Sequence, residues 1–157
     1  MKKMGKIAQL SVVVGMAWSL VTPVLAADDY IADYAARVKA ADWTKQETVT
    51  VTLDEHSFTP SELKFVAGKA YKLELKNIGK KDHYFTAEKF FRAVAWRKAM
   101  VNKQAEIKAP FFTAFEPLKN GGQVDLYFVP VTPGSYELIC TIEDHKEQGM
   151  RGTLTIE

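Results

Sequence analysis

Short segments in which apolar and polar residues alternate run from Thr48 to the end of the chain, and no other feature constrains the fold more. A period of two places every second side chain on one face, which is the pattern of a strand with one buried face. The alternating segments are residues 49–53, 71–75 and 150–157. Residues 58–66, which include a turn, 123–130 and 134–141 are further strand candidates, and Gly, Pro and Asn turn signals separate these segments. Many short strands with regular turns favour a β-sandwich, and we therefore expect an all-β fold.

Two segments interrupt the alternation and are predicted to be helical. Apolar residues recur at three- and four-residue spacing over residues 28–43, which predicts a short helix in an N-terminal extension, residues 27–47. Thr86 is a suitable N-cap with Glu88 in the following turn, so we expect a second helix over residues 86–104. This helix belongs to a predicted helical insertion, residues 86–115. Aromatic residues in the insertion are expected in the core more than on a docking surface: Phe90, Phe91, Trp96, Phe111, Phe112 and Phe115.

The first 26 residues have the features of a secretory signal peptide. Three lysines precede an apolar run over residues 7–21, and Val24 and Ala26 occupy the −3 and −1 positions of a cleavage site. The apolar run is shorter than the roughly 20 residues that span a bilayer. We expect cleavage, export to the periplasm and no membrane span in the mature protein, with an uncleaved anchor as the alternative.

The net charge of the mature region gives no indication of nucleic-acid binding. Removal of three lysines with the leader leaves 18 basic residues against 19 acidic ones. The region also lacks a basic cluster with interleaved aromatic residues. We therefore expect no nucleic-acid partner.

Cys140 is the only cysteine, so an internal disulfide is excluded. An odd cysteine in an exported chain is an intermolecular bridge, a reactive thiol, a buried hydrophobic residue or a metal ligand. His145 and Met150 follow it within eleven residues, on a loop between two predicted strands. Two His, one Cys and a weak axial Met form a type 1 copper site. His83, just after the strand that ends near Gly79, is the candidate for the second histidine.

The sequence resembles the cupredoxin family in an ordered set of segments. Residues 133–140, Pro-Gly-Ser-Tyr-Glu-Leu-Ile-Cys, followed by His145 and Met150, resemble its copper-binding loop, and residues 58–60, 67–69 and 77–83 resemble its first half. The resemblance covers residues 48–157 apart from the insertion and implies a cupredoxin-like Greek-key β-sandwich. It also implies one copper ion, cycling between Cu(I) and Cu(II), with His83, Cys140 and His145 as equatorial ligands and Met150 as the axial ligand.

Two departures from the minimal family pattern resemble its acidophile oxidase-partner and periplasmic copper-tolerance branch. Tyr84 stands where a small polar residue often ties the two copper-binding loops together, and the insertion after it is long. In that branch the copper site can be green instead of blue. The resemblance leaves the colour of this site open.

These features favour an electron carrier that exchanges electrons with a c-type cytochrome or a terminal oxidase. The alternative is a periplasmic copper-binding or copper-tolerance protein, although the Met- or His-rich tracts common in such proteins are absent from the mature sequence. An enzyme is disfavoured, with an oxidoreductase that acts only through a partner as the alternative. A multicopper centre needs more histidines, and only His56, interpreted as a solvated residue in a polar turn, is left over. A cysteine nucleophile would need an oxyanion hole that nothing in the loop indicates.

Overall fold

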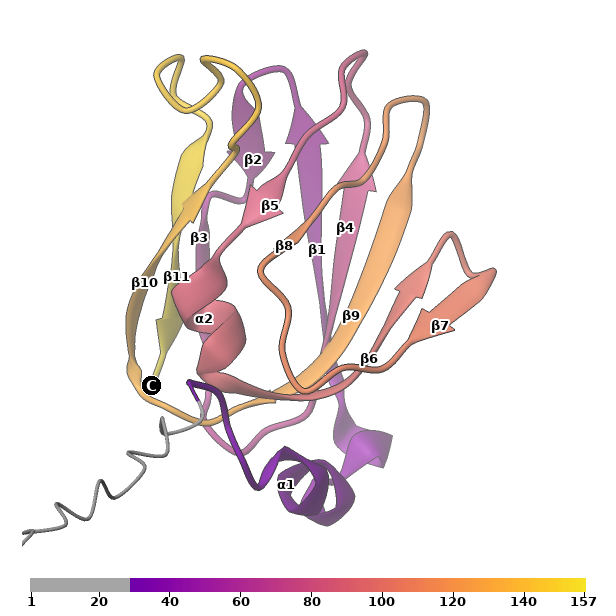
Figure 1. Cartoon of the computed structure of the whole chain (residues 1–157), viewed down its shortest axis with the longest axis vertical. Helices are drawn as coiled ribbons and strands as arrows, with labels where there is room; N and C mark the ends of the chain where they lie inside the picture. The colour runs from indigo at the N-terminus through magenta and orange to yellow at the C-terminus, as the bar shows by residue number, and fades with distance from the viewer. Residues whose placement is uncertain (1–28) are drawn as a thin grey trace, which may run out of the picture.

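The computed structural model describes residues 29–157, which form a sandwich of two β-sheets with short helices at its edges (Figure 1). The predicted signal peptide, residues 1–26, lies outside the described residues. Within the described part of the chain, no helix is both long enough and apolar enough to cross a membrane. The predicted all-β sandwich is confirmed.

The larger sheet has six strands in the order β2-β1-β4-β9-β6-β7. Strand β1 runs parallel to β4, and the remaining neighbours pair antiparallel. The alternation predicted from the sequence is clear in β4, where Tyr71, Leu73 and Leu75 are buried and the residues between them are partly exposed. The bounds are β1 Glu47–Asp54, β2 Ser57–Thr59, β4 Tyr71–Asn77, β6 Val94–Val101, β7 Ala105–Ile107 and β9 Gln123–Pro130.

The smaller sheet has five strands in the order β3-β11-β10-β5-β8. Strand β11 pairs parallel with β3 and antiparallel with β10. Strands β10 and β11, which flank the candidate copper-binding loop, therefore lie side by side in the middle of this sheet. The bounds are β3 Glu62–Phe65, β5 Phe85–Thr86, β8 Ala114–Phe115, β10 Gly134–Ile139 and β11 Arg151–Ile156.

The predicted helix over residues 86–104 is wrong for most of its length. Only α2, Glu88–Arg92, is helical, and Val94–Val101 forms β6 instead. The apolar side chains of this segment spread around a helix, whereas as a strand they pair with β9 and bury Val94, Ala95 and Trp96. Tertiary pairing here outweighs local helix propensity. The insertion predicted as helical at residues 86–115 thus consists of one short helix and short strands.

The N-terminal helix is present but shorter than predicted. Helix α1 spans Tyr34–Ala40, a 3₁₀ turn follows at Trp43–Lys45, and none of their residues is buried. The indole N–H of Trp43 donates to the carbonyl of Val38, and the guanidinium of Arg97 in β6 lies 4.3 Å from the Trp43 ring. These contacts fix the extension to the edge of the larger sheet.

One core rich in aromatic residues fills the space between the sheets. The rings of Phe90, Phe91 and Trp96 are buried within it, and Phe112 and Phe115 pack against its side. These five aromatic residues therefore pack in or against the core, as predicted, and each fully buried ring contributes roughly 1.5–3 kcal/mol to folding. The prediction is wrong for Phe111, which lies outside this cluster and packs against Tyr30 and the guanidinium of Arg92. The β1–β2, β4–β5 and β10–β11 connections meet at one end of the sandwich, opposite α1 (Figure 1).

Candidate metal centre

The β10–β11 loop carries Cys140, His145 and Met150, and backbone hydrogen bonds within the loop set their positions. The N–H of Cys140 donates to the carbonyl of Met150 at 3.0 Å, and the N–H of Met150 donates to the carbonyl of His145 at 2.9 Å. Gly149, at φ 104°, adopts a backbone conformation that favours glycine and lets the chain turn back into β11. The loop therefore brings residues ten positions apart together at its base.

His83 comes from the β4–β5 connection, which Asn77 holds in place. The buried amide of Asn77 donates to the carbonyls of Lys81 and Pro117, each at 2.8 Å, and its side-chain oxygen accepts from the N–H of Gly79. Three hydrogen bonds from one buried side chain thus fix the segment that leads into His83. In the sequence, Asn77 only begins the segment 77–83 that resembles the family, and its clamping role is not predictable because Pro117 is distant in the chain.

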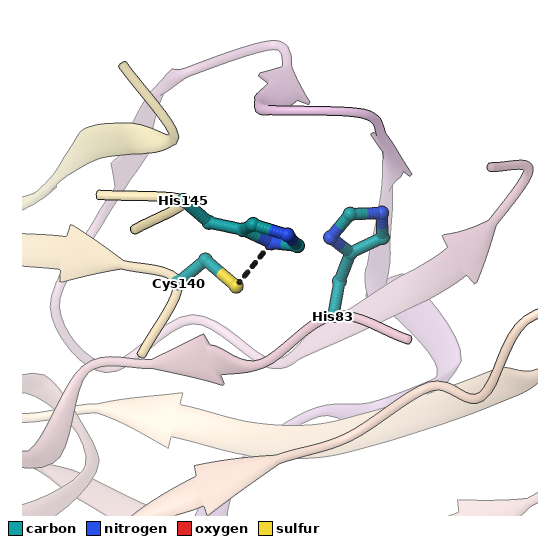
Figure 2. A group of neighbouring side chains, drawn as sticks. All are labelled: His83, Cys140 and His145. Carbon is teal, nitrogen blue, oxygen red and sulfur yellow. Dashed lines mark hydrogen bonds between the residues drawn. The ribbon is translucent and has the colours of Figure 1, made fainter. Parts of the chain in front are cut away.

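His83, Cys140 and His145 converge on one point from the two connections (Figure 2). One ligand atom from each residue lies within 4.8 Å of the others, and all three residues are fully buried. The Sγ of Cys140 is 3.4 Å from Nδ1 of His145. This is the scale at which one first-row metal ion, roughly 2.0–2.3 Å from each ligand atom, can bind all three. The structure thus brings together the three residues that the sequence predicted as equatorial ligands.

The imidazole nitrogens of this cluster are unusual because they are buried and have no protein partner. Both ring nitrogens of His83, and Nε2 of His145, lack a hydrogen bond. Burial is the main cause that lowers the pKa of both histidines, and each is lowered further by a neighbouring histidine, His145 for His83 and His56 for His145. Buried polar atoms are normally paired, so an unpartnered set indicates a missing ligand. Neutral imidazoles beside a thiol are chemically suited to a soft or borderline metal ion.

The two loops are tied together by contacts that do not use the side chain of Tyr84. The backbone N–H of Tyr84 donates to Sγ of Cys140 at 3.4 Å, and the hydroxyl groups of Thr86 and Thr141 are 3.2 Å apart. A hydrogen bond to the sulfur stabilises negative charge on it and tunes a bound metal. The bulky residue at position 84 therefore leaves the connection intact, since its backbone and Thr86 supply it.

Met150 is fully buried beside Cys140. Its backbone is paired with that of Cys140, and its side chain belongs to the same apolar cluster. This placement is compatible with the predicted axial position.

His56 is not the solvated residue that the sequence suggested. It lies in the turn between β1 and β2, at φ 60°, and its ring packs edge-on against His145 with 4.9 Å between centroids. Nε2 of His56 is buried without a hydrogen-bond partner. The prediction of a solvated His56 is wrong because its polar neighbours, Asp54, Glu55 and Ser57, indicate an exposed turn. The contact between this turn and the β10–β11 loop exists only in the tertiary structure.

The sequence profile of the cupredoxin-like domain matches residues 30–156, which is most of the chain. The chain belongs to the cupredoxin-like family. No curated protein sequence matches it.

Solved structures similar to this cupredoxin include an auracyanin from the photosynthetic bacterium Roseiflexus castenholzii. The two sequences are 19% identical, and the structures align with a TM-score of 0.51 over 70% of this chain and 96% of the auracyanin chain. A multicopper oxidase from Pseudomonas thermotolerans has 18% identity and a TM-score of 0.56, covering 74% of this chain. A copper nitrite reductase from Nitrosomonas europaea has 11% identity and a TM-score of 0.55, covering 70%.

The match covers nearly the whole length of the auracyanin chain but only part of each of the two enzymes. The chain spans 31% of the oxidase and 48% of the nitrite reductase. At these identities the similarity establishes the fold alone. The chemistry of this chain has to be argued from its own residues.

Proposed function

We propose that this cupredoxin binds one copper ion through His83, Cys140, His145 and Met150 and carries single electrons in the periplasm. The observation that carries the proposal is the buried convergence of one thiol and two unpartnered imidazoles. Thiolate and imidazole, with a weak thioether, are ligands that accommodate both Cu(I) and Cu(II). Copper bound there supplies a one-electron redox couple.

The protein's own residues favour electron transfer over bond-making catalysis. All four proposed ligand residues are fully buried, so a substrate would have no direct access to their side chains. The tie between the backbone of Tyr84 and the Cys140 sulfur, together with the Asn77 clamp, holds the ligand geometry fixed. A fixed geometry lowers the rearrangement needed when the charge of the site changes by one electron.

The experiment that tests this proposal is the visible absorption and EPR spectrum of the purified, copper-loaded protein. We expect an intense thiolate-to-copper band that is lost in Cys140→Ser, because serine provides no thiolate. A colourless protein with full copper occupancy would contradict the type 1 site. The position of the band also decides between a blue and a green site, and hence whether the acidophile oxidase-partner and copper-tolerance branch describes this chain.

A second experiment separates the carrier from the copper-tolerance alternative. We expect rapid electron exchange with a c-type cytochrome or terminal oxidase, and no copper sensitivity in a strain that lacks the gene. Slow exchange combined with copper sensitivity would favour tolerance. Measuring the N-terminus of the exported protein tests cleavage of the predicted signal peptide at the same time.

A further inference from the structure

The side of His145 that faces away from Cys140 is enclosed. Nδ1 of His145 faces the sulfur at 3.4 Å, so Nε2 lies on the opposite edge of the ring. That nitrogen is buried and has no hydrogen-bond partner, and the residue as a whole is 0% exposed. Whatever covers this edge controls what can reach the site through His145.

The ring of His56 packs against the ring of His145. It meets the ring of His145 at an interplanar angle of 75°, an edge-to-face arrangement that is favourable between aromatic rings. His56 is itself partly exposed, whereas His145 is fully buried. It is also outside the set of converging ligand atoms, which comprises only His83, Cys140 and His145 among the described residues.

The turn that carries His56 is fastened to the connection that carries His83. The side chain of Asp54 accepts from the N–H of Glu55 at 2.8 Å, and the carboxylate of Glu55 accepts from the N–H of Lys80. The side chains of Asp54 and Glu55 also lie beside Gly79, where an added Cβ would be 3.2 and 3.1 Å from their oxygens. Three connections, β1–β2, β4–β5 and β10–β11, therefore form one interlocked end, and the position of His56 is set by it.

We propose that His56 is a positioning residue that covers the outer edge of His145, excludes solvent and small molecules from it, and is the last side chain that an electron crosses on this route. The electron-transfer part rests on the proposed function, whereas the covering part depends only on the protein. The ring carries the effect through its shape, so phenylalanine should replace it. Glycine should remove it without strain, because φ at position 56 is in the left-handed region.

The first test uses the metal-free protein and diethyl pyrocarbonate, which modifies accessible imidazoles, with mass spectrometry to locate the modified residue. We expect His145 to react at least about tenfold faster in His56→Gly than in the unaltered protein, equivalent to about 1.4 kcal/mol less protection. In His56→Phe it should stay protected. His83, buried and without a ring contact to His56, is the internal control and should remain unreactive in all three proteins. Equal reactivity of His145 in all three proteins would overturn the proposal.

The second test uses the copper-loaded proteins and ferrocyanide, a one-electron donor. One electron passes from ferrocyanide to the oxidised protein, which yields ferricyanide and the reduced protein. We expect faster exchange in His56→Gly, because the donor can approach His145 directly, and an unaltered rate in His56→Phe. If His145 becomes reactive in His56→Gly but the rate of electron exchange does not change, the proposed electron route is overturned. The covering role of His56 would still stand. Protection by His56 in a protein that forms no thiolate–copper band would instead count against the proposed function alone.

Discussion

At the scale of single residues, the site is defined by atoms that are buried without partners. Both ring nitrogens of His83 and Nε2 of His145 have no hydrogen bond, although unpaired buried polar groups cost roughly 1–3 kcal/mol each. A protein retains such groups where a ligand compensates for them. The combination of ring nitrogens with Cys140 is what distinguishes this cluster from a set of ordinary buried side chains.

Met150 provides a prediction at this scale. Met150→Leu conserves volume and should change the stability of the metal-free protein by less than about 1.5 kcal/mol. Copper should still bind, but we expect a higher reduction potential, because losing a weak axial donor lowers the coordination number and disfavours Cu(II). Protein-film voltammetry and urea unfolding measure the two effects. An unchanged potential and an unchanged spectrum would exclude Met150 as a ligand.

At the scale of elements, the site depends on connections more than on strands. Asn77, at the end of β4, binds the β4–β5 connection to the β8–β9 connection through the carbonyls of Lys81 and Pro117. His83 therefore takes its position from a side chain six residues earlier in the sequence and from a loop more than thirty residues later. The strands hold the two connections at the same end of the sandwich, and the hydrogen bonds of Asn77 set the position of the His83 segment within it.

Asn77→Ala should weaken both the fold and the metal site. The carbonyls of Lys81 and Pro117 and the N–H of Gly79 would lose their partner, which should lower the free energy of unfolding by about 2–3 kcal/mol. We also expect weaker copper binding, because the His83 segment is released. Urea unfolding and competitive copper titration measure these losses.

Asn77→Asp is the informative companion variant. It keeps the acceptor for Gly79 but turns the two donor bonds into contacts between oxygens, so it should be at least as destabilising as alanine. If aspartate instead restored normal stability, the donor bonds to Lys81 and Pro117 would not be what holds the loop.

At the scale of the whole molecule, the outer face of the larger sheet carries an ion-pair network across β4 and β9. Lys72 lies 2.6 Å from Glu74 and 3.1 Å from Asp125, and Lys76 lies 2.7 Å from Glu74. The side chains of Lys72, Glu74 and Asp125 are largely buried, so these pairs are screened less than ordinary surface pairs. Hydrogen bonds from Lys72 and then Lys76 lower the pKa of Glu74 to about 2.

This network predicts a defined acid dependence of stability. Because the pKa of Glu74 is lower in the folded than in the unfolded protein, its contribution is fully present above about pH 4.5 and is lost as the pH falls toward 2. The upper limit is about 3 kcal/mol, since one pKa unit corresponds to about 1.4 kcal/mol. Urea unfolding of the metal-free protein between pH 7 and 3 should show a shallower acid dependence in Glu74→Gln than in the unaltered protein. Glu62→Gln, at an exposed position on β3, is the matched control and should leave the dependence unchanged.

The sequence by itself predicted the all-β sandwich and a loop that carries three of the four proposed ligands. Alternation in residues 71–75 specified a strand because a half-buried strand requires it. The close spacing of Cys140, His145 and Met150 placed all three candidate ligands in one connection. The choice of His83 needed the family resemblance, since nothing local to that residue marks it as a ligand.

Only the tertiary structure decided the rest. Residues 94–101 became a strand because β9 offered a pairing edge, which no local pattern reports. Asn77 became a clamp and His56 a cover for the same physical reason: their partners are brought to them by contacts between segments far apart in the chain. Residue types and spacing set which atoms could bind a metal. The packing of three connections at one end of the sandwich set how tightly those atoms are held and which of them is shielded.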